Sequence, residues 1–162
     1  MRSWVGSTPA LFRRIVADRM ARQTFRGSIP GNLLYDLEYD MWLQRDGDTV
    51  LIGATSFGVF LAGEIIAFTA KPNGAECALG RGIATVECAK TVLAVHAPLS
   101  IIILAGNEKV EEAPAILNQY PYGAAWMVRG RAVAWEVEHA RLVDSSVYRS
   151  HILRMEPSAS FL

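Results

Sequence analysis

The chain has 162 residues, 51% of them hydrophobic, and its 16 basic residues balance 16 acidic ones, so the formal net charge is zero. This length allows one domain with a sizeable core. The neutral charge argues against nucleic acid as a partner, because neutralising phosphates requires an excess of Lys and Arg. No apolar run approaches the roughly 20 residues that a membrane-spanning helix needs, so we expect no membrane partner either.

Residues 1–34 are expected to form an N-terminal extension and linker. They contain six arginines and one acid, Asp18, and therefore carry a local charge of +5. Apolar residues at positions 11, 12, 15, 16 and 20 have helical spacing and predict an amphipathic helix. The Gly- and Pro-containing segment 27–31 predicts a linker after it. This helix either covers the apolar run Ile101–Leu104 or belongs to a cleaved transit peptide over residues 1–27, which would place the protein in the mitochondrial matrix.

Residues 35–162 have the pattern of one β-rich domain. Turn signals at 46–48, 72–74 and 80–82 separate short stretches rich in Val and Ile. The stretches expected to be strands are Thr49–Ile52, Glu64–Ala70, Ile83–Cys88, Val92–His96 and Leu99–Leu104. Strands spaced in this way predict a sandwich or a barrel. Short helices are expected at Glu111–Leu117 and, near the C-terminus, at Ser145–Leu153.

Lysine is scarce in this chain, which makes Lys90 conspicuous. The only other lysines are Lys71 and Lys109. An apolar strand runs through small residues to Lys90, and a second one leaves after it, so the pattern predicts a hairpin with Lys90 at its tip. A lysine amine can be acylated, whereas an arginine guanidinium has no equivalent chemistry at neutral pH. The alternative is an ordinary solvated lysine in a turn.

The residues around Lys90 resemble a known modification site. Val86-Glu87-Cys88-Ala89-Lys90 is similar to the V-E-S-x-K lipoylation motif of the glycine cleavage H-protein family. Further resemblances extend from about Tyr35 to Leu153. They are Gly63–Ile66 to the G-D-I-V segment of the family, Ala97–Ser100 to S-P-V-S, Asn107-Glu108 to its N-E pair, Asn118–Trp126 to N-x-x-P-Y-G-x-G-W, and Leu142–Tyr148 to its closing helix.

This resemblance implies a mainly β, barrel-sandwich hybrid fold with covalent lipoate on Lys90. It also implies that Glu87 helps a lipoate–protein ligase to recognise the hairpin, and that the protein is a non-catalytic carrier. A biotin carrier has M-K-M at its hairpin tip, and Ala89-Lys90-Thr91 does not match it. Neither the cysteines nor the histidines have metal-ligand spacing, so no metal is expected.

The nature of the carried group depends on acids near the lipoyl arm. In the H-protein family the aminomethyl-loaded arm folds back onto the protein, and a charged amine needs carboxylates close by. Ala94 stands where the family has an acid four residues after the lysine, and Met41 stands where it has Glu before Trp42. Asp40 reaches that position with a one-residue gap.

The sequence is also similar to the lipoate-binding proteins of the heterodisulfide-reductase-like sulfur oxidation pathway. The similarity lies in Phe25-Arg26-Gly27, Ala67–Pro72 and Tyr148–His151. Opening of the lipoyl dithiolane gives two thiols that can carry sulfur covalently. We therefore expect a carrier of a sulfur-containing intermediate that works with a lipoate–protein ligase and a heterodisulfide-reductase-like enzyme complex. Two cysteines without a disulfide framework favour the cytoplasm.

Three alternatives remain open at this point. The first is a glycine cleavage H protein that carries an aminomethyl group between the glycine cleavage enzymes. The second is an unlipoylated adaptor that retains the same fold. The third is a thiol redox protein that uses Cys77 and Cys88, which requires both thiols to be accessible.

Overall fold

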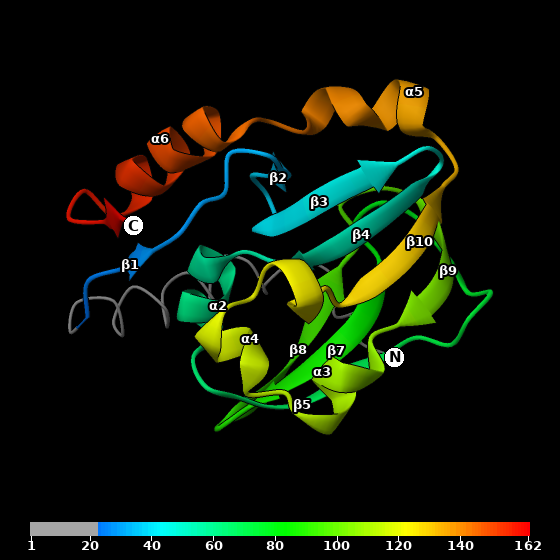
Figure 1. Cartoon of the computed structure of the whole chain (residues 1–162), viewed down its shortest axis with the longest axis horizontal. Helices are drawn as coiled ribbons and strands as arrows, with labels where there is room; N and C mark the ends of the chain where they lie inside the picture. Colours follow the sequence, from blue (N-terminus) through cyan, green and yellow to red (C-terminus); the bar gives the residue numbers. More distant parts are fainter. Residues whose placement is uncertain (1–22) are drawn as a thin grey trace, which may run out of the picture.

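More residues lie in strands than in helices in the part of the chain that the structure describes. A computed structural model describes residues 23–162 (Figure 1), and the expected amphipathic helix over residues 11–20 lies outside this part of the chain. The strands are β1 (Arg26–Gly27), β2 (Leu34–Asp36), β3 (Met41–Asp46), β4 (Thr49–Ala54), β5 (Ile65–Ala70), β6 (Glu76–Cys77), β7 (Gly82–Cys88), β8 (Thr91–His96), β9 (Ile101–Gly106), β10 (Val128–Ala132) and β11 (Ser160–Phe161). The helices are α2 (Ser56–Ala62), α3 (Glu108–Glu112), α4 (Ile116–Gln119), α5 (Trp135–Glu138) and α6 (Ser145–Met155), with 3-10 turns at Gly123–Ala125 and His139–Arg141.

Two antiparallel sheets enclose the main core. The larger sheet has six strands in the order β2-β3-β4-β10-β9-β6, and the smaller one has three in the order β5-β7-β8. Ile52 and Ile103 of the larger sheet belong to the same buried cluster as Phe68 and Val86 of the smaller one. Alternation of apolar and polar residues in β7 produces this arrangement, because every second side chain points into the core. The predicted mainly β fold with short helices is confirmed.

A second buried cluster lies on the other face of the larger sheet. It brings the segment before β2 and helix α6 onto strands β2 and β3, and helix α2 also contributes to it. Its members are Phe25, Ile29, Leu33, Tyr35, Trp42, Phe57, Tyr122, Tyr148 and Ile152. Trp42 faces this cluster while its neighbours Met41 and Leu43 face the main core, so β3 is buried on both sides.

Packing of the second cluster includes the segment that the sequence indicates as a linker. Ile29 is buried, and Gly27 pairs with Phe161 in the parallel two-stranded sheet β1–β11. Tyr35 stacks on Tyr148 of α6 with ring centroids 4.8 Å apart. The segment therefore packs against the C-terminal elements β11 and α6 through Gly27 and Ile29, while Gly31 and Asn32 stay exposed. The division of the chain at residue 34 stays a prediction.

Several elements differ from the sequence expectation. The helix expected over Glu111–Leu117 is interrupted, and α3 and α4 replace it. Pro114 explains the break, because a residue before proline is driven out of the helical region, and Ala113 has φ −136° and ψ 70°. Helix α6 was predicted, and its N-cap Asp144 accepts a hydrogen bond from the Val147 amide at 2.9 Å.

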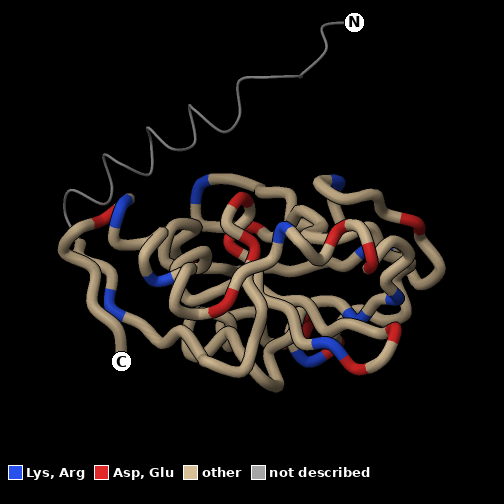
Figure 2. Tube along the Cα trace, turned by 90° about the horizontal axis from the view of Figure 1, so that it is seen from above, with Lys and Arg blue, Asp and Glu red and all other residues tan. Residues whose placement is uncertain are grey.

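The apolar strand β9 has one face in the core and one face partly covered. Ile101 and Ile103 are buried, whereas Ile102 and Leu104 are half-buried. Covering of this outer face by residues 11–20 stays a prediction. Basic and acidic residues are interspersed along the described part of the chain (Figure 2). No helix in residues 23–162 is long and apolar enough to cross a membrane.

Candidate functional site

The hairpin expected around Lys90 is present. Strands β7 and β8 pair up to Cys88 and Thr91, which leaves Ala89 and Lys90 as a two-residue turn. In Figure 1 this hairpin extends past α2 and α4 to the periphery of the molecule. Asp40 is the only residue other than glycine with a positive φ in the described chain, so neither turn residue has left-handed strain. The turn therefore presents a lysine without a backbone penalty.

Lys90 and Glu87 both point to solvent. Both side chains are exposed, and within residues 23–162 neither forms a hydrogen bond or an ion pair. Glu87 stands directly between Ala67 on β5 and Val92 on β8. The amine of Lys90 is thus free to react, and Glu87 is available to a partner protein.

The core side of the hairpin holds the turn in place. Val86, Cys88 and Val95 are all buried against the main core. Cys88 faces inward, opposite to Glu87, as the strand alternation predicts. Cys77 is buried as well, and no disulfide joins the two cysteines. Burial of both thiols argues against a redox role for this pair, since reactive cysteines are partly exposed.

Asn118 anchors the strand next to the hairpin. Its side-chain oxygen accepts a hydrogen bond from the Ile65 amide at 2.9 Å, and its amide nitrogen donates to the Gly63 carbonyl at 2.8 Å. These two bonds fix the start of β5, where Ile65 pairs with Cys88. The Asn of the family-like segment Asn118–Trp126 therefore positions the lysine hairpin, a role that the sequence pattern alone does not reveal.

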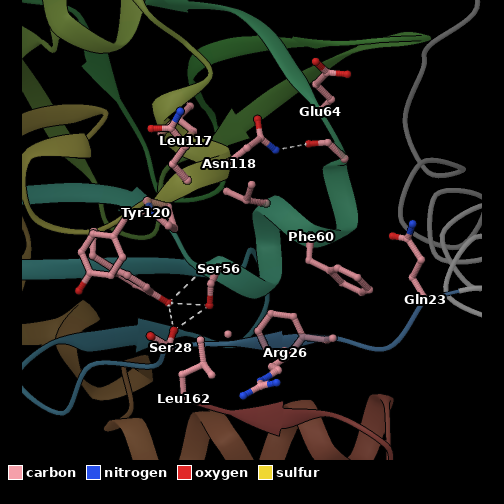
Figure 3. Close-up of a pocket in the computed structure, with 17 residues that line it drawn as sticks. Gln23, Arg26, Ser28, Ser56, Phe60, Glu64, Leu117, Asn118, Tyr120 and Leu162 are labelled. Carbon is pink, nitrogen blue, oxygen red and sulfur yellow. Dashed lines mark hydrogen bonds between the residues drawn. The ribbon is translucent and has the colours of Figure 1, made fainter.

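A groove of about 490 Å³ lies beside β5, between β1, α2 and α4 (Figure 3). Its inner wall is closed by hydrogen bonds: the Tyr122 hydroxyl donates to the Ser28 carbonyl at 2.7 Å and accepts from the Ser56 amide at 3.0 Å. The polar atoms on this wall are therefore already bonded to one another. Tyr122 therefore has a structural role. Gly63 and Glu64, which also line the groove, directly precede β5, the strand that pairs with β7 of the hairpin.

The carboxylate of Asp40 is bonded to helix α6. Tyr148 donates a hydrogen bond to Asp40 Oδ1 at 2.7 Å and lies 2.8 Å from the hydroxyl of Thr55. Burial and the nearby Asp40 carboxylate raise the pKa of Tyr148 well above its usual value, so the phenol remains a donor. Ala94, by contrast, is exposed on the outer face of β8, two residues along that face from Val92.

Comparisons with known proteins agree with this geometry. The family model described as "Glycine cleavage H-protein" matches residues 33–154. This chain belongs to the glycine cleavage H-protein family. Members of the family are non-catalytic carriers that hold lipoate covalently on a lysine.

Individual relatives cover most of the chain. The glycine cleavage system H protein of Halothermothrix orenii is 31% identical over 129 residues, which are 80% of this chain and 99% of the relative. That of Mycolicibacterium vanbaalenii is 31% identical over 127 residues, 76% of this chain and 96% of the relative. A crystal structure of a glycine cleavage system H protein from Mycobacterium marinum is similar with a TM-score of 0.67 and 28% identity, and covers 76% of this chain and 98% of that chain.

Proposed function

We propose that this member of the H-protein family holds lipoate in amide linkage to Nζ of Lys90 and presents it to the glycine cleavage enzymes. The observation that carries the proposal is the free, exposed Lys90 in the two-residue turn of the β7–β8 hairpin. Lipoate supplies a dithiolane that accepts and releases the cargo. The residues of this chain hold the attachment point still, keep its amine in solvent, and offer a surface to the partner enzymes.

Glu87 is proposed as the residue through which a lipoate–protein ligase recognises the hairpin. Glu87→Ala is expected to lower the rate of lipoylation by about tenfold, the size of one lost charge-assisted contact. The melting temperature should stay unchanged because Glu87 is exposed and unpaired within the described residues. Intact-mass measurements over time with a purified ligase, together with thermal unfolding, provide both readouts.

The matched control for this variant is Glu76→Ala. Glu76 is an exposed acid at the edge of the other sheet, in β6, and it pairs with Ile102. It should be lipoylated at the wild-type rate. A large loss of stability in Glu87→Ala with a normal lipoylation rate would show that Glu87 is structural.

The proposed cargo is the aminomethyl group that glycine cleavage produces. The family membership and the coverage of 99% of one H-protein relative support it. One observation favours a second candidate, the sulfur-containing intermediate passed to a heterodisulfide-reductase-like complex: position 94 is an alanine, and the Asp40 carboxylate is bonded to Tyr148. A sulfur cargo has no ammonium group and needs no acid at these positions.

A variant that supplies the missing acid separates the two cargoes. The lipoylated protein is expected to support glycine cleavage with a complete set of partner enzymes. Ala94→Asp should increase the turnover, because a carboxylate near the arm stabilises the cationic aminomethyl form. Ala94→Asn, which adds the same bulk without the charge, is the control. No glycine turnover from a fully lipoylated protein, with or without Ala94→Asp, would overturn the aminomethyl proposal and favour the sulfur cargo.

A further inference from the structure

Two large apolar side chains stand uncovered beside Lys90. Val92, two residues after the lysine, is 60% exposed, and Ile66 on the neighbouring strand β5 is 54% exposed. We call this pair the apolar flank. Neither residue belongs to the two buried clusters. They therefore add little to the stability of the fold, in contrast to the inward-facing Val86 and Val95 of the β7–β8 hairpin, which are buried.

An irregularity in β5 brings Ile66 to the solvent face. The pairing of β5 with β7 shifts between Ile65 and Ala67, so Ile65 pairs with Cys88 while Ala67 pairs with Glu87. One extra residue in a strand is the signature of a β-bulge, which redirects a side chain. Ile65 remains buried and Ile66 turns outward. Without the bulge, the register that pairs Ala67 with Glu87 would pair Ile66 with Cys88, and Ile66 would face the core as Cys88 does.

The register places the apolar flank on both sides of one acid. Val92 pairs directly with Glu87 across β7–β8, and Ala67, next to Ile66, pairs with Glu87 across β5–β7. Glu87 therefore lies between Val92, directly opposite it on β8, and the segment of β5 in which Ile66 precedes its partner Ala67. It is one pair of residues away from the Ala89-Lys90 turn. Apolar contacts around a charged group exclude water when a partner binds, and exclusion of water strengthens the charged contact.

We propose that the apolar flank, together with Glu87, is the surface that the lipoate-attaching enzyme contacts, an inference that rests on the proposed function. The enzyme must enclose the turn in order to bring Nζ of Lys90 to an activated lipoyl carboxyl group. The outer face of the hairpin sheet continues directly from that turn, whereas the inner face is filled by the core. The chemistry of the flank specifies the partner surface: apolar side chains around a basic group that pairs with Glu87.

The test uses substitutions that keep the branch at Cβ. In Val92→Thr/Ile66→Thr the side chains stay β-branched and suited to a strand, but the apolar contact is lost. With a purified lipoate–protein ligase, the kcat/KM for lipoylation, followed by intact mass, should fall about tenfold, mainly through KM, as expected for lost contacts outside the chemistry. The melting temperature should not change, and Val92→Ile should retain the wild-type KM. Val137→Thr is the control, since Val137 on α5 is 80% exposed and far from the hairpin in sequence.

The outcomes separate this inference from the proposed function. Wild-type kinetics in the double Thr variant would overturn the docking surface while lipoylation of Lys90 stood. A KM increase equal to that of Val137→Thr would overturn it too, because the effect would not be specific to the flank. A wild-type chain that takes up no lipoate at all would overturn the proposed function and, with it, this inference.

Discussion

Replacing Lys90 with arginine is expected to abolish lipoylation completely. Arginine keeps the positive charge and the solvent exposure, but its guanidinium is not acylated at neutral pH. Lys90 is exposed and has no bonded partner within residues 23–162, so the substitution should leave the free energy of unfolding unchanged. The measurement is the intact mass after incubation with lipoate and a purified lipoate–protein ligase: the wild-type chain gains one lipoyl group, and Lys90→Arg gains none.

The other two lysines provide matched controls for this experiment. Lys71 and Lys109 are both exposed, but neither lies in a hairpin turn. Lys71→Arg and Lys109→Arg should each gain one lipoyl group at the wild-type rate. A lipoyl mass on Lys90→Arg would move the attachment site to one of these residues. The absence of any lipoyl mass on the wild-type chain would instead favour an unlipoylated adaptor.

The sequence predicted the hairpin well because local signals are strong there. Alternating Val, Ile and Thr residues mark β7 and β8, and the same alternation predicts that Glu87 faces solvent and Cys88 faces the core. Both orientations are found. The exposure of Ile66 was beyond that reasoning, because a bulge breaks the two-residue period and depends on how β5 pairs with β7.

Elements buried on both faces were harder to recognise. Strand β3 begins Met41-Trp42-Leu43, a run without alternation, since each face packs against a different core. Helix α2 was missed because its seven residues are mostly apolar and leave no polar stripe. Its start is set by Thr55, whose side chain caps the Gly58 amide, and Thr55 is itself held by Tyr148 from far along the chain.

Long-range packing also explains why residues 27–31 resembled a linker. Glycine, serine and proline in a short segment usually indicate a loop, and nothing local shows that the C-terminal end of the chain returns to it. In the structure the Tyr122 and Ser56 hydroxyls both bond to the Ser28 carbonyl, and β11 pairs with β1. The segment therefore belongs to the folded domain. Its strand β1 forms only because it pairs with β11, more than a hundred residues further along the chain.

Phe25→Ala tests how strongly this segment contributes to the fold, and it should lower the free energy of unfolding by about 3–5 kcal/mol. Phe25 lies outside the family match but is only 2% exposed. Its ring packs at centroid distances of 5.2 Å from Phe57 and 5.4 Å from Phe60, and its amide donates to the buried Glu156 carboxylate at 3.0 Å. Removing the ring leaves a cavity between elements that cannot close together, because β1 is tied to β11 on its other side. Urea-induced unfolding measures the loss.

A truncation that removes residues 1–22 is the companion to this variant, because it keeps Phe25 and the whole β1–β11 pair. The truncated protein should be more stable than Phe25→Ala, because the packing of Phe25, and not the arginine-rich residues 1–22, holds β1 against the domain. A loss below about 1 kcal/mol in Phe25→Ala, well under the range for a buried aromatic ring, would mean that the segment is a dispensable appendage. Lipoylation of folded Phe25→Ala should stay normal, since Phe25 belongs to the second cluster and the hairpin is built on the main core. Because the two cores are separate, a substitution in the second cluster can lower the stability of the fold without moving Lys90.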